Sequence, residues 1–551
     1  MVQIGCSRRG TTSMLAAASV LALHVASARA DSHAVVSTDK GPVRGTVTED
    51  GRQFLGIPYA SPPVGNKRFM PPTDASRWHG VRDATEFAPH CAQRATPFGL
   101  ATESEDCLYL NVYTPANSHD DSDADSDEQG DEGDADGHHR SPVMVWIHPG
   151  AFQYGESDDY NPSALVANDV VVVTINYRLG ALGFISHPAL TAESSIGSSG
   201  NYGFMDQQAA LRWVQRNITH FGGDPGNVTI FGESAGALSV HAHMVAPGST
   251  GLFHKGIVQS GAYNLAQPTL AAGEAEGQTF AAALGCGTPA TAAACLRGMS
   301  VSALLAQQAL NVNPAAWQPR VDGAILPQGV GAAFASGQFN RVPIIEGTTH
   351  DEFTLFTATL FVFRGIPVNA ATYPSLVASV LGVPLATATF IANTFYPLAA
   401  YGGNAGLALS AVGTDAAFAC NSRLAARRIS QYAPTWTYEF SDTTAPMIFL
   451  PPAGFPYGAY HGSEVQYLMG ERNAVPAPGL NAQQLQLADV MQGYWTQFAH
   501  TGDPNDGVGP SWPAYQPTTS DFFQKFVGTS PQPYSGTAFA ADHKCAVWGS
   551  P

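Results

Sequence analysis

Ser234 stands in a Gly-x-Ser-x-Gly pattern, with Gly232 and Gly236 two residues to either side. A β-branched and aromatic run at residues 228–231 leads into this pattern, and small residues compatible with a helix follow it. At a sharp turn from strand to helix, a serine projects its hydroxyl away from the backbone, and the turn has room only for small neighbours. The pattern therefore predicts a nucleophile elbow with Ser234 as the nucleophile. A base, an acid and an oxyanion site elsewhere in the chain are needed to complete the site.

A serine nucleophile also needs a site for the oxyanion that forms when it attacks a carbonyl. The apolar run 143–147 leads directly into a His-Pro-Gly-Ala sequence that ends at Ala151. Because small residues after a strand let the backbone approach a substrate oxygen, the N–H groups of Gly150 and Ala151 are candidate donors. The N–H of Ala235 is the third, since the first turn of a helix has free N–H groups.

Runs of apolar residues bounded by loops indicate the sheet that must position these groups. Residues 143–147 and 170–176 are continuously apolar, which is typical of central parallel strands covered on both faces. Between them and the elbow the apolar period becomes helical over residues 207–221, and strand, helix and strand in succession indicate an α/β fold. We also expect an N-terminal hairpin at 35–38 and 43–47, strands at 256–261 and 342–347, a last central strand at 435–440, and Ala- and Leu-rich cap helices, notably over 371–430.

Residues 145–155 read Val-Trp-Ile-His-Pro-Gly-Ala-Phe-Gln-Tyr-Gly and resemble the Trp-Ile-His-Gly-Gly-Gly-Phe signature of the type-B carboxylesterase and cholinesterase family. The resemblance covers nearly the whole mature chain, through blocks at 54–65, 105–115, 176–184, 201–206, 213–225, 228–240, 251–261, 321–327, 458–470 and 498–505. It implies an α/β-hydrolase fold with a central, mostly parallel sheet, helices on both faces and helical cap insertions. It also implies ester hydrolysis by a serine, an acid and a histidine in that chain order.

The same resemblance assigns the acid and the base. The sequence Gly-Thr-Thr-His-Asp-Glu-Phe, which ends at Phe353, is similar to a family block that usually reads Gly-Thr-Asn-x-Asp-Glu-Gly and places the acid at Glu352. Asp351 is the competing acid, because adjacent carboxylates cannot both face one histidine from the same loop. His461, followed by a glycine, resembles the family's catalytic histidine and is the predicted base. Two other histidines near the site resemble scaffold positions: His148 and His350.

Three departures from the family pattern bear on the substrate. Pro149 and Ala151 replace the first and third glycines of the signature. Proline lacks an N–H, but its position is not one expected to donate, whereas the methyl of Ala151 narrows the room beside the acyl carbonyl. We therefore expect a preference for short to medium acyl groups. Residues 91–107 contain no tryptophan, although a cholinesterase places its choline-binding indole in this loop, which argues against choline esters.

The cysteines indicate disulfides. Cys6 falls in the first 30 residues, and the remaining six cysteines are an even number in an exported chain, which favours disulfides but leaves their connectivity open. The family resemblance implies the pairs Cys91 with Cys107, Cys286 with Cys295, and Cys420 with Cys545. None of these cysteines has zinc-ligand spacing, and the sequence predicts neither a metal nor a cofactor.

The first 30 residues have the features of a secretory signal peptide. Arg8 and Arg9 precede an apolar run at 14–25, and Ala28-Arg29-Ala30 supplies a small-x-small cleavage site. The predicted mature chain is a single domain over 31–551, secreted or periplasmic. Its acidic character, a formal charge of −18 for the full chain, disfavours nucleic acid and anionic membranes as partners. The apolar run is too short to span a membrane, and we identify no stable membrane anchor.

Ten acidic residues fall between positions 120 and 136, inside a stretch rich in Asp, Ser and Gly at about 117–140. The alternation of Asp121, Asp123 and Asp125 would suit the oxygen ligands of calcium. However, Ser126 stands where an EF-hand loop needs glycine, and no helices flank the stretch. The composition favours a solvated, disordered surface insertion.

The predicted protein is a secreted serine carboxylesterase that acts on small-molecule esters. A lipase for longer-chain glycerides is the alternative with the same fold, and it would need a large apolar lid that the sequence does not reveal. A third interpretation is a binding protein of the adhesion type found among relatives that lost the serine. The retention of Ser234 and its partners argues against it. The oligomeric state stays open.

Overall fold

The computed structural model describes residues 33–48, 50–116, 140–309, 316–471, 479–507 and 509–549. Residues from His33 onward form one compact unit. Two predictions from the sequence, the signal peptide at 1–30 and the acidic insertion at about 117–140, lie outside the described residues, except for Arg140 at the end of the insertion.

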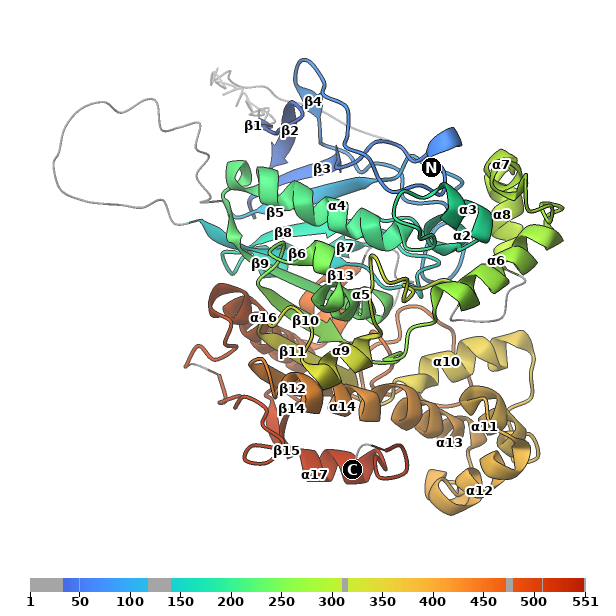
Figure 1. Cartoon of the computed structure of the whole chain (residues 1–551). Coiled ribbons are helices and arrows are strands. Elements are labelled where there is room, and N and C mark those ends of the chain that lie inside the picture. Colours follow the sequence, from blue (N-terminus) through green and yellow to red (C-terminus); the bar gives the residue numbers. More distant parts are fainter. Residues whose placement is uncertain are drawn as a thin grey trace, which may run out of the picture. The chain divides into compact units, whose positions relative to one another are not determined.

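One large sheet organises the chain (Figure 1). Its strands lie in the order β1-β2-β3-β5-β8-β6-β9-β10-β11-β12-β14-β15, and β4 pairs with β2. Neighbours from β8 to β14 are all parallel, and the pairs toward both edges are antiparallel except for β2 with β4, so the mostly parallel sheet is confirmed. The strands are β1 His33–Ser37, β2 Pro42–Val47, β3 Arg52–Pro58, β4 Arg82–Asp83, β5 Tyr109–Thr114, β6 Ser141–Ile147, β8 Val171–Ile175, β9 Gly223–Glu233, β10 Lys255–Gln259, β11 Ile344–Thr349, β12 Thr435–Phe440, β14 Phe522–Phe526 and β15 Gln532–Ser535.

The predicted strands are all present, and the predicted N-terminal hairpin is the antiparallel pair β1 and β2. The sheet continues beyond β12, which we expected to be its last central strand. β14 pairs with β12 in parallel, and β15 turns back along β14. The run Phe522–Phe526 is short and contains Gln524 and Lys525, so its apolar pattern alone does not distinguish a strand from a loop.

Successive side chains of a strand point to opposite faces of the sheet, and different helices cover each face. On β6, Val143, Val145 and Ile147 belong to one hydrophobic core, whereas Met144 and Trp146 belong to the other. The first core includes buried residues of α4 Tyr202–Asn217, α5 Ser234–Val245, α9 Val330–Ser336 and α14 Cys420–Ile429, and the second includes those of α15 Val465–Leu468 and α16 Ala482–Thr501. The continuous apolar character of β6 is thus explained by burial on both faces.

Helical insertions surround this core, as predicted. One group comprises α6 Leu270–Ala283, α7 Ala292–Gly298 and α8 Val301–Gln308, and the other comprises α10 Phe353–Leu360, α11 Tyr373–Leu381, α12 Leu385–Phe395 and α13 Ala405–Gly413 (Figure 1). The second group has its own small core, which includes Tyr373, Val377 and Leu409. Helix α10 begins directly after Glu352, so this cap is joined without a linker to the predicted acid.

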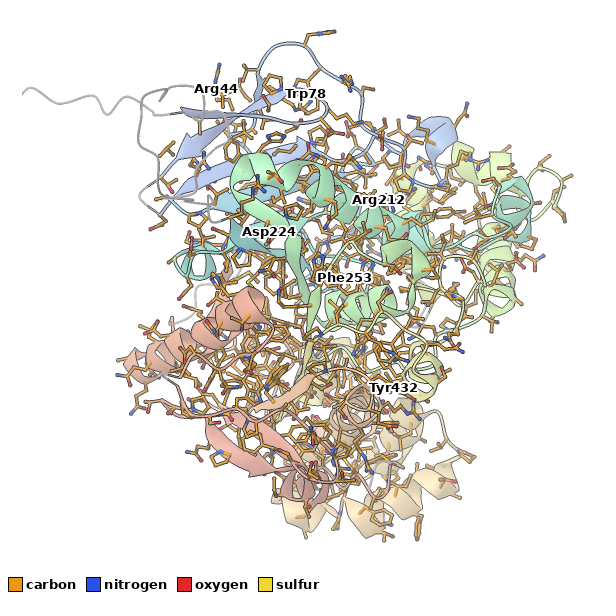
Figure 2. The ribbon with its side chains drawn as sticks, turned by 60° about the vertical axis from the view of Figure 1, so that its left-hand side comes forward. Arg44, Trp78, Arg212, Asp224, Phe253 and Tyr432 are labelled. Atoms are coloured by element: carbon orange, nitrogen blue, oxygen red, sulfur yellow. A yellow bond between two sulfur atoms is a disulfide. The ribbon has the colours of Figure 1, made fainter. Side chains whose placement is uncertain are left out.

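The remaining helices are short: α1 Ser163–Val166, α2 Gly180–Phe184, α3 Pro188–Glu193 and α17 Gly536–Asp542. Side chains fill the space between the sheet and its helices, and Arg44 of β2 forms an ion pair of 3.1 Å with Asp83 of β4 at the edge of the sheet (Figure 2). Among the described helices, none is by itself long and apolar enough to cross a membrane. Only α11 and α12 taken together reach that threshold, and they are bent by 111° at the break between them.

Three disulfides connect the cysteine pairs that the family resemblance implies. They join Cys91 to Cys107, Cys286 to Cys295, and Cys420 to Cys545. The third spans 125 residues and ties the segment after α17 to the start of α14. A crosslink that closes so long a loop removes much of the freedom of the unfolded chain.

Candidate active site

The elbow has the geometry that the pentapeptide predicts. Strand β9 ends at Glu233, α5 begins at Ser234, and the backbone of Ser234 is left-handed with φ of 53°. A Cβ on Gly236 would lie 1.8 Å from the carbonyl oxygen of Ile147, and one on Gly232 would lie 2.6 Å from the backbone of Gly236. Both positions therefore require glycine. The left-handed serine costs about 1–2 kcal/mol, which the packed surroundings must offset.

The predicted acid and base are in contact. Glu352 follows β11 and is fully buried, and its Oε2 lies 2.5 Å from Nδ1 of His461. The other carboxylate oxygen of Glu352 accepts hydrogen bonds from the Thr348 hydroxyl at 2.6 Å and the Thr349 N–H at 2.9 Å. Burial alone would raise the pKa of Glu352, but His461 and the hydroxyl donors hold it below its usual value. An ionised Glu352 can fix the orientation and the tautomer of His461.

Asp351, the competing acid, contacts different groups. One of its carboxylate oxygens accepts a hydrogen bond from the N–H of Ala459 at 2.9 Å, and the other lies 3.0 Å from Nδ1 of His350. No contact between Asp351 and the imidazole of His461 is found within the described residues. Of the two adjacent carboxylates, the geometry brings Glu352 to the predicted base.

The second nitrogen of His461 faces the elbow. Nε2 of His461 lies 3.1 Å from Oε1 of Glu233, the residue before Ser234. His461 and Ser234 also line the same cavity, and both are almost completely buried. The order from Glu352 through His461 to the elbow is the order that proton transfer from a serine hydroxyl requires.

The predicted oxyanion loop lies on the same cavity. Gly150 and Ala151 both line it, and their backbones have φ values of 110° and 53°. A Cβ on Gly150 would lie 1.9 Å from the carbonyl oxygen of Tyr154, so this position requires glycine. Ala235, the third predicted donor, is buried in the first turn of α5, where its N–H has no partner within the helix.

His148 precedes this loop and is not among the residues that line the cavity. Its ring stacks on Tyr177 with a centroid separation of 4.4 Å, and the Tyr177 hydroxyl donates to the His148 carbonyl at 2.9 Å. Burial lowers the pKa of His148 to about 4, so the ring is neutral at ordinary pH. These contacts agree with the predicted scaffold role of His148.

The cavity has a volume of about 640 Å³, including space open to solvent. Its wall is largely aromatic and aliphatic, and the ionisable residues Glu233, Asp159 and His461 also line it. Its apolar lining was not predicted from the sequence and consists of Phe98, Tyr154, Tyr160, Leu355, Phe356, Phe449 and Val465. Tyr154 falls inside the signature and Phe356 follows the acid by four residues, so proximity to those motifs was the available signal. Phe98 and Phe449 lie far apart in the chain, with ring centroids 5.3 Å apart, and carry no local signal.

Aromatic rings also hold the imidazole of His461. Phe356 of α10 and Phe418 lie with their ring centroids 4.9 Å and 5.0 Å from it, and they stack on each other at 5.6 Å. Burial and the charge of Glu352 raise the pKa of the carboxyl of Glu464 to about 8. Glu464 is therefore protonated at neutral pH, which limits the negative charge around His461.

Comparisons with known proteins show the family to which the chain belongs. The model of the carboxylesterase family matches residues 32–548. A fumonisin B1 esterase of Sphingopyxis macrogoltabida is 34% identical over 94% of this chain and 90% of its own length. A cocaine esterase of Oryctolagus cuniculus is 34% identical over 92% of this chain and 93% of its own length. Among solved structures, a PNB esterase aligns with a TM-score of 0.74 and 30% identity, covering 93% of this chain and 99% of that one.

Proposed function

This chain belongs to the carboxylesterase family and is a carboxylic ester hydrolase, and from that premise we propose that it works through an acyl-enzyme formed on Ser234. The observation that carries the proposal is the contact of 2.5 Å between buried Glu352 and His461, whose ring lines the same cavity as Ser234. A serine needs such an oriented base because its hydroxyl is a weak nucleophile at its own pKa.

In the acylation step His461 accepts the hydroxyl proton of Ser234 while the serine oxygen attacks the ester carbonyl. Glu352 stabilises the imidazolium that forms. The developing oxyanion is held by the N–H groups of Gly150, Ala151 and Ala235, and the rigid loops that carry them do not have to reorganise. As the intermediate collapses, His461 returns its proton to the leaving alcohol, and Ser234 remains acylated.

In the deacylation step water replaces the alcohol. His461 removes a proton from the water while the water oxygen attacks the acyl carbon, and the same three N–H groups hold the second oxyanion. Collapse of this intermediate releases the carboxylic acid and returns the proton to the oxygen of Ser234. The apolar wall around Phe356 and Leu355 keeps other water away from the acyl-enzyme.

We further propose that the preferred substrates carry short to medium acyl groups. Ala151 lines the cavity, and Phe98, Tyr154 and Phe449 occupy the same wall. The ring pair Phe98 and Tyr154 is stacked at 5.8 Å, which limits how far either side chain can swing without losing its partner. The relatives are named for different esters, fumonisin B1 and cocaine, so the cavity wall is the better guide to this chain's substrate.

The export of the chain is also a proposal. The predicted signal at residues 1–30 and the three disulfides both fit an oxidising compartment outside the cytoplasm. N-terminal sequencing of the protein from its culture medium or periplasm would identify the start of the mature chain, which we expect close to Asp31. Recovery only from the cytoplasm with residues 1–30 intact would contradict this.

A panel of p-nitrophenyl esters of increasing acyl length, run beside choline esters, tests activity and preference together. We expect kcat/KM to be highest for short to medium acyl groups and low for choline esters. Ser234→Ala should retain the fold and lose activity by at least about 1,000-fold, and a covalent serine inhibitor should label Ser234 in the parent. Parental turnover in Ser234→Ala would rule out the mechanism, and higher kcat/KM for long acyl chains would favour a lipase.

A further inference from the structure

A partly exposed imidazole lies beside the catalytic acid, between two carboxylates. His350 is the first residue after β11 and comes two positions before Glu352. Its Nδ1 lies 3.0 Å from Oδ1 of Asp351, and its Nε2 lies 3.5 Å from Oδ2 of Asp542, at the end of α17. The backbone N–H of His350 donates to the carbonyl of Phe440 at 2.9 Å, which holds the ring at the end of β12.

Asp351 connects this imidazole to the loop of the catalytic base. Its second oxygen accepts the N–H of Ala459 at 2.9 Å, and its own N–H donates to the Ala459 carbonyl at 2.9 Å. Ala459 comes two residues before His461. A Cβ on Gly458 would lie 2.1 Å from the carboxylate of Asp351, so this approach depends on glycine. Asp351 thus fastens the loop of Glu352 to the loop of His461.

A second imidazole, fully enclosed, extends the contacts to the C-terminal segment. His543 follows α17, and its two nitrogens lie 2.8 Å from Asp415 and 2.7 Å from Glu439. Its ring centroid is 5.5 Å from that of His350. Hydrogen bonds to both carboxylates outweigh burial and raise the pKa of His543 to about 9, so it is an imidazolium at neutral pH. The disulfide from Cys545 to Cys420 anchors this segment two residues later.

By distance alone, His350, Glu439 and His543 could hold a metal ion, because they offer ligand atoms within 4.8 Å of one another. The hydrogen bonds favour protons instead. Both ring nitrogens of His543 already face carboxylates, and Lys525 lies 3.2 Å from Glu439. A metal would have to displace the protons that these carboxylates stabilise and would lie close to the ammonium of Lys525.

We propose that His350 is a positioning residue for ester hydrolysis: its imidazolium, held by Asp542, neutralises and fixes Asp351, which in turn holds the backbone of the His461 loop. This inference rests on the proposed function of Ser234, Glu352 and His461. We call His350, Asp351 and Asp542 together the clamp. The clamp gives the C-terminal segment a role in catalysis, because Asp542 and His543 of this segment both contact His350.

The charges around the imidazoles of His461 and His350 determine how the loss of the cation at position 350 would affect catalysis. His461 faces Glu352 and Glu233, with Phe356 and Phe418 on its ring, while His350 faces Asp351, Asp542, Glu439 and His543. Without the cation at position 350, the charge of Asp351 would be uncompensated near His461 and would favour its imidazolium. The acidic limb of the pH profile, where His461 must lose a proton to act as a base, would then move to higher pH.

Steady-state hydrolysis of p-nitrophenyl acetate from about pH 5 to pH 9 by the full mature chain tests the proposal. For His350→Asn we expect kcat to fall about 3- to 10-fold with little change in KM, and the acidic limb of kcat/KM to rise by about 0.5 pH unit. His350→Arg should restore the limb because it keeps a cation. The double variant His350→Asn with Asp351→Asn should also restore it, since it removes both charges and keeps an oxygen for the N–H of Ala459.

Controls separate this role from a structural one. His500→Asn changes another histidine, on α16, whose ring nitrogen lies 3.1 Å from the Asn168 carbonyl, and this variant should behave as the parent. If His350→Asn lowers Tm but leaves kcat and the acidic limb unchanged, the proposal is overturned. If it does not fold, the double variant and His350→Arg decide, and an acidic limb shifted upward in either would overturn it.

Two further outcomes are distinguishable. If His350, Glu439 and His543 bind zinc, a chelator should lower Tm and activity, and Zn²⁺ should restore both. That result would overturn the proposal that protons, not a metal, occupy these groups. A failure of the proposed function would appear differently, as ester hydrolysis by the parent that survives Ser234→Ala. The clamp is supported only if Ser234-dependent activity is present and the pH limb responds to the charge at position 350.

Discussion

Replacing Ala151 by glycine tests whether one methyl group limits the acyl pocket. Ala151 has φ of 53°, in the left-handed region where alanine costs about 1–2 kcal/mol relative to glycine. Glycine would remove that strain, but its freer unfolded chain offsets about 0.4–1 kcal/mol. We therefore expect the free energy of unfolding to rise by at most about 1.6 kcal/mol, so that a loss of stability cannot account for any kinetic effect.

The size of the kinetic effect follows from how a pocket discriminates single carbon groups. One methylene in an apolar pocket is worth about 1–3 kcal/mol, and Ala151 lines the same cavity as Ser234. We expect the ratio of kcat/KM for p-nitrophenyl octanoate to that for the acetate to rise about 10-fold in Ala151→Gly. Most of this increase should come from the octanoate, because the acetate does not reach the space that the methyl occupies.

The matched control is Asp169→Gly, which replaces another left-handed residue, with φ of 58°, outside the residues that line the cavity. Asp169→Gly also loses the hydrogen bond that its carboxylate accepts from the Ser141 hydroxyl at 3.1 Å, so its stability should fall, but the acyl ratio should stay at the parental value. An unchanged ratio in Ala151→Gly would refute the steric argument and place the chain-length limit on the aromatic wall. A fall in acetate turnover with no gain for octanoate would show that the methyl is needed to hold the oxyanion loop.

Two further predictions concern Glu352 and His543. Glu352→Gln keeps the shape of the acid but removes the charge 2.5 Å from His461, so kcat for p-nitrophenyl acetate should fall about 100- to 10,000-fold with a smaller change in KM, and a parental kcat would exclude Glu352 as the acid. His543 has a folded pKa of about 9, above its ordinary value, so its contribution to stability is complete below about pH 6.5 and is lost as the pH rises through about 9. His543→Gln should therefore be destabilised most at pH 6, on the order of 2–3 kcal/mol, with a gap in Tm to the parent that narrows toward pH 9, and a gap independent of pH would contradict the charged clamp.

Local sequence patterns were sufficient for the elements that build the elbow. The strand before Ser234 and the helix after it follow from the apolar run, the glycines and the small residues, and the structure places the strand end and the helix start at Glu233 and Ser234. Central strands such as β6 were also predictable, because burial on both faces leaves them continuously apolar. β14 was not, since a strand near the sheet edge needs fewer apolar residues and therefore leaves a weaker pattern.

The site could be predicted only where a motif surrounds the residue. Glu352 was favoured over Asp351 by family resemblance, and nothing local distinguishes two adjacent carboxylates. The structure separates them because a helix begins directly after Glu352, so that its side chain turns toward His461 while that of Asp351 turns toward Ala459. Phe98 and Phe449 could not be predicted, because they meet only after the chain has folded and neither lies in a recognisable motif.

The elbow packs directly against the strand end that leads into the predicted oxyanion loop, and this packing limits how substrate preference can change. The strand that carries the oxyanion loop ends at Ile147, whose carbonyl oxygen is so close to Gly236 and Gly232 that neither can accept a Cβ. Gly150 is held in the same way by the carbonyl of Tyr154. Since neither loop can shift without colliding with the other, the distance between Ser234 and the N–H donors is fixed by backbone packing. Preference among esters must then be set by side chains on the cavity wall, and among these residues Ala151 is also one of the three proposed N–H donors.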